Sequence, residues 1–341
     1  MAATYKDIQR LTGLSLSTIS KYFNGGSVKK STRVAIESVV TQLDYRINDM
    51  ARGLKSKKSM AVGLLIPRLN SLFAVNMMRH IGHFLRTKGY SCIVCDSDAS
   101  RVTEREAVNF LIDKTVDGII TMPFDPSGSQ LEPAKTRGLP IVFIDRKPAS
   151  IEADVVLTDN YEAGRIAAKH LIDYGHTETA IIYGPSYVYT MSQRYKGFMD
   201  TYAKYCPQAS IRSIETFFSM EESYKTTREL LSGKPGVTSL FCVNYELMIG
   251  AYAAIYDMGL RYPGDISFVG FDNLEMAQIM KPSITRIEQP MERIARTAAD
   301  LLIKRIEIRN GGSAEQDGSE IIFETVMYKP TLINGESVAR R

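Results

Sequence analysis

The sequence predicts an all-α helix-turn-helix head followed by an α/β core of two doubly wound parallel-sheet subdomains. Three observations lead to this prediction. Residues 4–45 show only helical patterns, the chain from Met60 alternates apolar runs with amphipathic stretches, and a second series of the same kind begins after Asp159. A chain of 341 residues can hold two or three folding units with sizeable cores.

The positive charge of the chain is concentrated at its N-terminal end. Residues 1–60 contain 11 Lys and Arg against 4 Asp and Glu, whereas the remaining 281 residues contain 31 against 34. This asymmetry is expected when one end of a protein binds a polyanion such as DNA. The N-terminus lacks an apolar run of signal-peptide length, and no 18 consecutive residues are apolar, so we expect a cytoplasmic protein.

The head should contain three short helices. We expect Thr4, Ser15 and Ser31 to cap them and Gly13 to form the tight turn between the first two. Apolar residues at helical spacing should close a small core, namely Ile8, Leu11, Ile19, Tyr22, Phe23, Ile36, Val39, Val40 and Leu43. Two helices joined by a glycine turn and backed by a third predict a helix-turn-helix, whose second helix lies in the major groove.

The core should begin after a basic hinge segment at 48–59. Apolar runs predict buried parallel strands at 60–67, 91–97, 116–123, 139–146, 179–185, 239–244 and 266–273. Amphipathic stretches predict helices at 73–88, 103–114, 161–174, 191–205, 221–231, 246–258 and 291–308, and a last strand at 320–328. The late helix and strand must join one or other half, so we expect the chain to cross between the halves more than once. A ligand would bind outside the carboxyl ends of the strands.

The cysteines and histidines do not predict a metal or cofactor site. Cys92 and Cys95 lie in an expected strand, where side chains three apart face opposite sides, and no second pair accompanies them. His80 and His83 are the only close histidine pair. The chain also lacks a GxGxxG after its first strand, a Walker loop and a GxSxG elbow. We therefore expect no cofactor and no enzymatic activity.

Several stretches resemble the LacI family of bacterial transcription regulators. In the head and hinge they are YKDIQRLTGLSLSTISKYFNGG, STRVAIESVVTQLDYRIN and ARGLKSKKS, and in the body they are TDNYEAGRIAAKHLIDYGH, SQRYKGF and YPGDISFVGFDN. The resemblance implies a repressor that binds a palindromic operator as a homodimer, with a periplasmic-binding-protein-like (type I) core for a small effector. It also implies the domain boundaries, which are 1–46 for the head, 47–59 for the hinge, 60–158 with 288–315 for one subdomain, and 159–287 with 316–341 for the other.

The resemblance implies a set of DNA contacts. Leu16, Ser17 and Lys21 would read base edges, and Leu54 would wedge into the minor groove at the operator centre. The remaining positions would contact the backbone or support these residues: Thr4, Tyr5, Thr18, Ser20, Asn24, Ser31, Tyr45, Asn48 and Lys55.

The resemblance also implies effector contacts at Phe73, Asp145, Thr190, Arg194, Asn244, Asp272 and Gln289. Asp145 and Asp272 each end an expected strand, where a carboxylate can accept hydrogen bonds from sugar hydroxyls. Other interpretations stay open, because Asp272 can form a local turn, Arg194 a surface ion pair, and Phe73 part of the core.

The identity of the effector is not readable from these residues. A carbohydrate is favoured. Tyr245 stands where the family usually has an acid, and two arginines (Arg146, Arg194) with several tyrosines (Tyr187, Tyr189, Tyr245) would tolerate an acidic or phosphorylated sugar as well as a neutral one. A purine or a partner protein remains an alternative effector. A solute-binding receptor remains an alternative function, but such a protein would carry a signal peptide in place of the basic head. Whether the effector induces or co-represses is also open.

Overall fold

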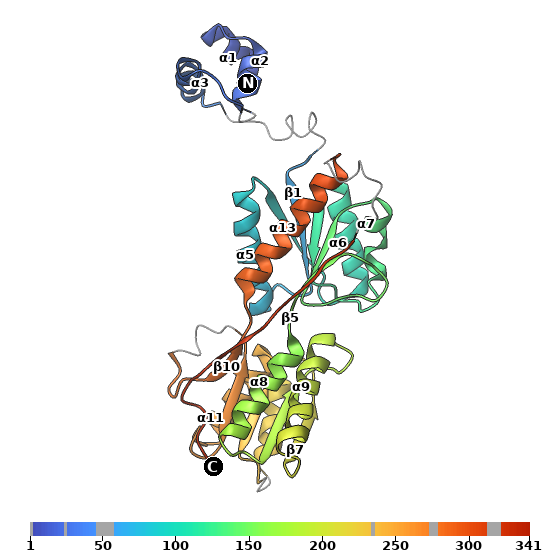
Figure 1. The fold of residues 1–341 in the computed structure, drawn as a ribbon, viewed down its shortest axis with the longest axis vertical. Helices are drawn as coiled ribbons and strands as arrows, with labels where there is room; N and C mark the ends of the chain where they lie inside the picture. The colour runs from blue at the N-terminus through green and yellow to red at the C-terminus, as the bar shows by residue number, and fades with distance from the viewer. Residues whose placement is uncertain (1–2, 24–25, 46–57, 233–235, 273–278, 312–321) are drawn as a thin grey trace. The chain divides into compact units, whose positions relative to one another are not determined.

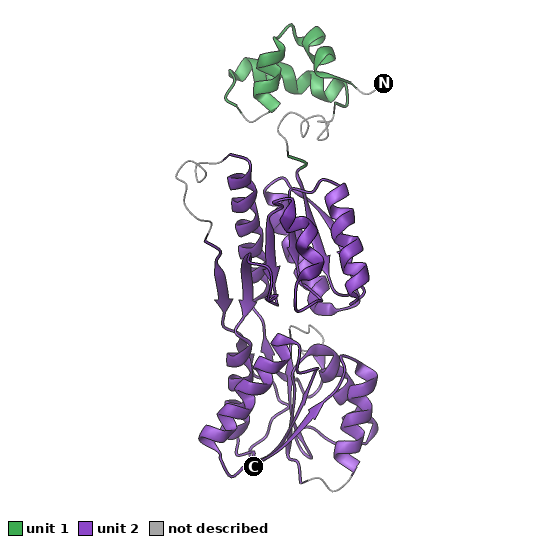
Figure 2. Cartoon of the chain, turned by 90° about the vertical axis from the view of Figure 1, so that its right-hand side faces the viewer, with its two compact units in different colours: residues 1–59 green, residues 60–341 purple. Residues whose placement is uncertain are grey.

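The computed structural model describes residues 3–23, 26–45, 58–232, 236–272, 279–311 and 322–341. The chain forms two compact units, residues 1–59 and residues 60–341, which Figure 2 shows in green and purple. We describe each unit separately. The hinge prediction falls almost entirely on 46–57, outside the described residues, and the same holds for Asn24, Asn48, Leu54 and Lys55.

The first unit contains the three expected helices, and two of their three expected caps are confirmed. The Asp7 carboxylate accepts hydrogen bonds from the Thr4 backbone N–H at 2.9 Å and hydroxyl at 2.8 Å, and the Ser15 hydroxyl accepts one from the Thr18 N–H at 3.2 Å. The cap expected at Ser31 is wrong, because the preceding Lys29 holds the extended backbone of the cap and Ser31 lies in the first turn. The helices are α1 (Tyr5–Thr12), α2 (Leu16–Phe23) and α3 (Lys30–Gln42).

The core of the head is built on one isoleucine from each helix. Ile8, Ile19 and Ile36 are fully buried, and the other residues packed around them are Tyr5, Leu14, Tyr22, Phe23, Val39, Val40, Leu43 and Tyr45. The prediction that Leu11 joins this core is wrong, because its side chain is 45% exposed. Gly13 has the left-handed backbone (φ 67°) that its turn requires, as the sequence predicted.

The first sheet of the second unit has the strand order β2-β1-β3-β4-β5-β11, with every neighbouring pair parallel. Helices α5 and α13 lie side by side on one face (Figure 1), and the other face carries α6, η1 and α7. The elements are β1 (Ala61–Ile66), α5 (Leu72–Thr87), β2 (Ser91–Asp96), α6 (Arg101–Asp113), β3 (Gly118–Thr121), η1 (Ser129–Leu131), α7 (Glu132–Thr136), β4 (Ile141–Ile144), β5 (Asp154–Thr158), α13 (Met291–Arg309) and β11 (Thr325–Tyr328).

The second sheet has the order β12-β10-β9-β8-β6-β7 and is parallel except for the β10–β12 pair. This arrangement confirms the predicted fold class, two doubly wound sheets behind a three-helix head. The elements are α8 (Asn160–Asp173), β6 (Glu178–Tyr183), α9 (Tyr189–Tyr205), β7 (Ser210–Glu215), α10 (Met220–Ser232), β8 (Ser239–Cys242), α11 (Tyr245–Asp257), β9 (Ser267–Phe271), β10 (Thr285–Glu288) and β12 (Thr331–Ile333).

The chain passes between the two sheets three times, after β5, after β10 and after β11. The prediction of more than one crossing is confirmed. The assignment of all of 316–341 to the second subdomain is wrong in part, because strand β11 pairs with β5 in the first sheet. An ion pair beside this strand explains the pairing. Asp154 at the start of β5 binds Arg305 of α13 at 2.7 Å and accepts a 2.7 Å hydrogen bond from the Glu324 N–H, 170 residues away in sequence.

Strand β2 differs from its prediction as a buried strand. It forms the edge of the first sheet, and its side chains are only half-buried or exposed. Cys92 packs on the α5 and α13 face and Cys95 on the opposite face, so the expectation that the two thiols point apart is confirmed.

Two helix pairs in the second half pack with their backbones in close contact. At Gly197 of α9 an added Cβ would lie 2.0 Å from the Tyr161 carbonyl oxygen, and at Gly164 of α8 it would lie 1.9 Å from the Arg194 carbonyl oxygen. At Gly250 of α11 it would lie 2.2 Å from the Met220 carbonyl oxygen. These glycines are therefore required for helix packing rather than for a turn.

Candidate functional site

Polar side chains gather where strands of both sheets end. Asp145 directly follows β4 and Asp272 directly follows β9, Gln289 directly follows β10, Asn244 lies two residues after β8, and the last residue of β5 is Thr158. All five residues stand at carboxyl ends of parallel strands, the edge at which doubly wound folds bind their ligands. We call the group formed by these residues with Asn160 and Arg194 the polar cluster.

Arg194 is the central cation of the polar cluster. It lies one turn into α9 and is only 2% exposed. Its Nε donates to Asn160 Oδ1 at 2.8 Å, its Nη1 donates to the Val243 carbonyl at 2.7 Å, and its guanidinium carbon lies 3.7 Å from the Phe271 ring centre. Burial lowers the pKa of Arg194, and the charges of Asp272 and Asp145 oppose that change. The alternative of a surface ion pair is therefore wrong.

Asp272 is the buried anion of the polar cluster. Its Oδ1 accepts a 2.6 Å hydrogen bond from Gln289 Nε2, and its Oδ2 accepts one at 3.3 Å from the Tyr245 backbone N–H. Burial raises the pKa of Asp272, whereas the Arg194 charge and these hydrogen bonds act to lower it. The backbone of Asp272 is left-handed (φ 77°), which an Asp tolerates better than most residues and which directs the carboxylate inward.

Hydrogen bonds join the two halves through the polar cluster. The Thr158 hydroxyl, on a strand of the first sheet, donates to Gln289 Oε1 at 2.6 Å. Asn160 Nδ2 donates to the Thr158 carbonyl at 3.0 Å and, through its oxygen, Asn160 binds Arg194. A continuous chain of hydrogen bonds thus runs from Asp272 through Gln289, Thr158 and Asn160 to Arg194.

Asp145 occupies the position in the first sheet that Asp272 occupies in the second, and it too has a left-handed backbone (φ 67°). Its surroundings are more open. Its Oδ2 lies 3.4 Å from Arg146 Nε, which is buried and makes no hydrogen bond. Arg146 Nη1 donates to the Pro123 carbonyl at 3.4 Å. The pair therefore holds a carboxylate and a guanidinium with unused hydrogen-bonding capacity.

The positions of the other three predicted effector residues also fit a structural role. Asn244 caps α11, where its Oδ1 accepts from the Leu247 N–H at 2.9 Å and its Nδ2 donates to Glu246 at 2.9 Å. Thr190 is buried in the first turn of α9, one turn before Arg194. Phe73, on α5, packs against the core of the first sheet, which fits a core residue as well as an effector contact.

Two residues of this region were missed by sequence reasoning. Asn160 positions Arg194, and its only signal was its place in the quoted TDNYEAG motif. Glu246 is a second largely buried acid, and burial raises its pKa, while Arg68 and Arg194 act to lower it. Neither residue could be linked to Arg194 by spacing, because Arg194 lies on another helix.

The face of α2 that carries the predicted base-reading residues is exposed. Leu16 is 39% exposed, and Ser17 and Lys21 are also exposed. Ser17 shares a 2.8 Å hydroxyl contact with the cap residue Ser15. The other described members of the set are exposed (Thr4, Ser31) or half-buried (Tyr5, Thr18, Ser20, Tyr45).

Tyr5 and Tyr45 also have a packing role. The ring centres of Tyr5 and Phe23 are 5.2 Å apart, and those of Phe23 and Tyr45 are 5.4 Å apart. Across the described ranges no group of three or more His, Cys, Asp and Glu side chains is arranged to hold a metal ion. Among the helices that the structure describes, none is long and apolar enough to cross a bilayer.

Comparisons with known proteins agree with this architecture. Residues 62–307 match the periplasmic binding protein domain family. The chain is 30% identical to the HTH-type transcriptional repressor PurR of Vibrio vulnificus, over 89% of this chain and 92% of that protein. It is 29% identical to PurR of Aliivibrio fischeri strain MJ11, over 99% of both chains.

Solved structures show the same fold. The lac repressor dimer bound to operator and an anti-inducer superimposes with a TM-score of 0.83, at 22% identity, over 99% of this chain and 100% of that chain. A LacI family regulator from Enterococcus faecium with bound ribose superimposes with a TM-score of 0.71, at 28% identity, over 82% of this chain and 99% of that chain.

The fold and these relatives define a DNA-binding transcription regulator with a periplasmic-binding-protein-type core. Within that class the chain belongs to the LacI family of transcriptional regulators. The sequence prediction of the family is confirmed, and so is the prediction that the protein is a regulator and not an enzyme.

Proposed function

We propose that this protein is a cytoplasmic repressor that binds a palindromic operator as a homodimer and whose operator affinity is controlled by a small effector, a sugar or sugar derivative. The observation that carries the proposal is the hydrogen-bonded chain from Asp272 to Arg194, which joins the two halves at the carboxyl ends of their strands. A ligand that binds there contacts both halves and is therefore able to favour one arrangement of them.

The proposal of a hydroxyl-bearing effector rests on the two aspartates. Carboxylates that follow equivalent strands in the two sheets can each accept hydrogen bonds from sugar hydroxyls. Arg194 Nη2 makes no hydrogen bond to any part of the chain that the structure describes, so it can donate to the same ligand. The Enterococcus faecium relative, with its bound ribose, supports a carbohydrate.

Control of DNA binding follows from linkage. An effector that binds two arrangements of the core with different affinity shifts the equilibrium between them, and DNA that prefers one arrangement responds by the same factor. In the head, Leu16, Ser17 and Lys21 would contact base edges, Thr18 would add a further DNA contact, and the residues that contact phosphates and fix register would be Thr4, Tyr5, Ser20, Asn24, Ser31 and Tyr45. In the hinge, Leu54 would wedge into the minor groove with Lys55 beside it, and Asn48 would cap the hinge helix.

The DNA part of the proposal is tested by selecting genomic fragments with the full-length protein. We expect a palindromic consensus and a steep loss of affinity as salt concentration rises. Lys21→Ala should weaken binding to the consensus by about 1–3 kcal/mol and relax the preference at one base position. Lys6→Ala, which removes the same charge from the exposed face of α1, serves as the matched control and should leave the preference intact. Recovery of fragments with no shared sequence would overturn this part.

The effector part is tested by calorimetry with ribose and other monosaccharides, and with a purine base as the competing class. Asp145→Asn should weaken binding of the active ligand by about tenfold or more, since a hydrogen bond to a charged group is lost. Asn tolerates the left-handed backbone at this position, so the fold should be kept. Asp113→Asn, at an exposed position in the same half, is the control. Unchanged affinity in Asp145→Asn would remove this residue from the site.

A further inference from the structure

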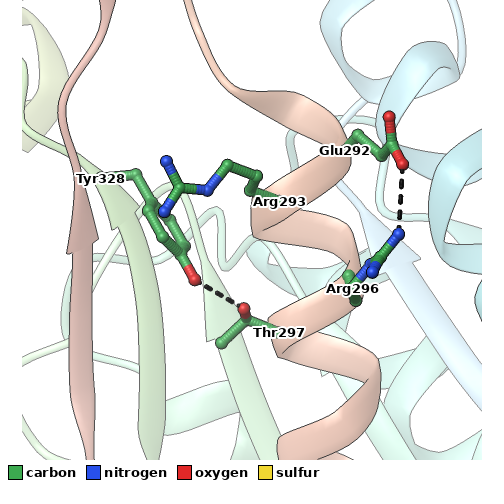
Figure 3. A pocket seen from close by; sticks show the side chains of 5 residues that line it. All are labelled: Glu292, Arg293, Arg296, Thr297 and Tyr328. Carbon is green, nitrogen blue, oxygen red and sulfur yellow. Dashed lines mark hydrogen bonds and ion pairs between the residues drawn. The ribbon is translucent and has the colours of Figure 1, made fainter.

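A pocket lies on the first half of the core, between α13 and β11. It has a volume of about 350 Å³ and is lined by Glu292, Arg293, Arg296 and Thr297 of α13 and by Tyr328 of β11. Figure 3 shows these side chains, with Arg293 extended toward Tyr328 and Arg296 toward Glu292. None of these residues takes part in the hydrogen-bonded chain described above.

Arg293 stacks on an aromatic ring in the pocket instead of forming an ion pair with a described acidic residue. Its guanidinium carbon lies 4.4 Å from the ring centre of Tyr328, and none of the described carboxylates forms an ion pair with it. The Tyr328 hydroxyl is in turn positioned by Thr297, at 2.8 Å between the two oxygens. A guanidinium stacked on a ring has lost conformational freedom but keeps the N–H edge that binds anions.

Arg296 is the second cation of the pocket and is weakly paired. Its guanidinium carbon lies 4.9 Å from the Phe84 ring centre, and one nitrogen contacts Glu292 at 3.4 Å. Both side chains of this ion pair are more than half exposed, so the pair contributes about 0–1 kcal/mol. An anion that binds Arg296 therefore has to displace only this weak ion pair.

The pocket adjoins two of the three crossings between the halves. Helix α13 begins at Met291, directly after the crossing that contains Gln289, and Tyr328 is the last residue of β11, after which the chain passes to β12 at Thr331. Four of the five lining residues thus lie in the first two turns of α13, and the helix dipole favours negative charge at the first of these turns. A ligand held between α13 and β11 touches the elements that connect the halves.

We propose that this pocket binds a small phosphate monoester and is a second regulatory site. Guanidinium geometry suits a phosphate group, and α13 presents one guanidinium on each side, Arg293 against Tyr328 and Arg296 against Phe84. The Thr297 and Tyr328 hydroxyls, which contact each other, also line the pocket and can bind the rest of the ligand. The volume of the pocket suits a molecule the size of a sugar phosphate. Because the site adjoins the crossings, its occupation changes the affinity of the polar cluster for its effector.

Calorimetry on the full-length protein tests this proposal, with glucose 6-phosphate, glucose and inorganic phosphate as probes. We expect glucose 6-phosphate to bind more tightly than inorganic phosphate, and an Arg293→Gln, Arg296→Gln double variant to lose about tenfold or more of that affinity. Arg309→Gln, on an exposed position at the far end of the same helix, is the charge-matched control and should bind as the parent does. Circular dichroism confirms that both variants are folded.

Three results would overturn the proposal. Absence of glucose 6-phosphate binding removes the site, and binding that survives in the double variant places it elsewhere. Equal affinity for inorganic phosphate and the ester removes the ester assignment. The DNA selection described above is independent of these outcomes, because the residues it tests all lie in the head.

Discussion

The head and the core use charged and polar residues in opposite ways. In the head, Ser17 and Lys21 stand exposed around a core of three isoleucines, and their positions follow from the repeat of a single helix. In the core, Arg194 of α9 and Asp272 after β9 are buried and are connected through residues at the ends of β5 and β10. An exposed polar face can therefore be encoded locally, whereas the buried polar cluster depends on topology. We therefore expect substitutions in residues 60–341 to lower the unfolding free energy of that unit several times more than substitutions in the head lower that of the head.

The largest effect is expected at the contact between α8 and α9. Gly197→Ala places a Cβ 2.0 Å from the Tyr161 carbonyl oxygen, so the helices must separate, and we expect the core to lose more than about 4 kcal/mol of unfolding free energy. Urea unfolding measures the loss. Gly82→Ala is the control, since its nearest neighbour is the flexible end of Arg86 at 3.4 Å, and it should be neutral or stabilising.

Removal of the buried cation should come next. Arg194→Met leaves Asn160 and the Val243 carbonyl without their partner and Asp272 without its counter-charge, which should cost about 3–5 kcal/mol. Amide exchange resolved by peptide should show the loss in the core and not in α1–α3. Arg165→Met, which removes a partly exposed arginine from α8, should cost less than about 1 kcal/mol. Equal losses for the two variants would mean that the polar cluster is no more sensitive than the surface.

A pH-dependent loss of comparable size is expected from His176. Its Nδ1 lies 2.8 Å from the Thr238 hydroxyl and its Nε2 lies 3.1 Å from the Ala339 carbonyl, and burial lowers its pKa to about 4. The unfolded chain has the ordinary pKa near 6.5, so the neutral ring stabilises the core fully above pH 6.5. That stability falls as pH drops toward 4, by up to about 3 kcal/mol.

Urea unfolding at pH 7 and pH 4.5 measures this loss. The difference should shrink in His176→Gln and persist in His83→Gln, which changes an exposed histidine of α5. An undiminished difference in His176→Gln would assign the acid sensitivity to other groups.

The smallest effect is expected in the head. Ser15→Ala removes the hydroxyl that accepts from the Thr18 N–H and should cost about 1 kcal/mol, seen as faster amide exchange in α2 with no change in the core. Ser31→Ala is the matched control, because Ser31 lies inside α3 and should be nearly neutral. Equal losses of stability in the two variants would contradict the assignment of Ser15 as a helix cap and Ser31 as a residue inside its helix.

The sequence predicted most of the fold, and the errors have physical reasons. Two edge strands escaped detection, because β7 is largely exposed and β12 has only three residues. Strand β5 was missed although it is fully buried, since it has only five residues and begins with Asp154, whose charge is balanced by the distant Arg305. Leu11 was placed in the core by its spacing, but α1 has only eight residues and the burial of Ile8 already fills its inner face.

The candidate site was predictable only in part. Asp145 and Asp272 each end a strand that the sequence predicted, so their place at the sheet edge could be read from the chain, whereas Gln289 was named only from the family resemblance because strand β10 was not predicted. The chain of hydrogen bonds through Asn160 and Thr158 could not, because it depends on which strands are neighbours and on the angle at which α8 enters the second half. The place of Tyr328 in the pocket between α13 and β11 could not be predicted either, because it depends on β11 belonging to the first sheet.

The pairing of β11 with β5 also determines when the protein can become complete during synthesis. Strand β5 leaves the ribosome long before its neighbour, since Asp154 and Glu324 are 170 residues apart. Until α13 is made, Asp154 lacks both of its partners, and until β11 is made, the edge of β5 is open and the first half lacks its last strand. Neither half of the core is therefore finished until nearly the whole chain has been made. A nascent chain must shield an unpaired strand edge throughout that interval, which makes this edge the point at which misassembly during translation would begin.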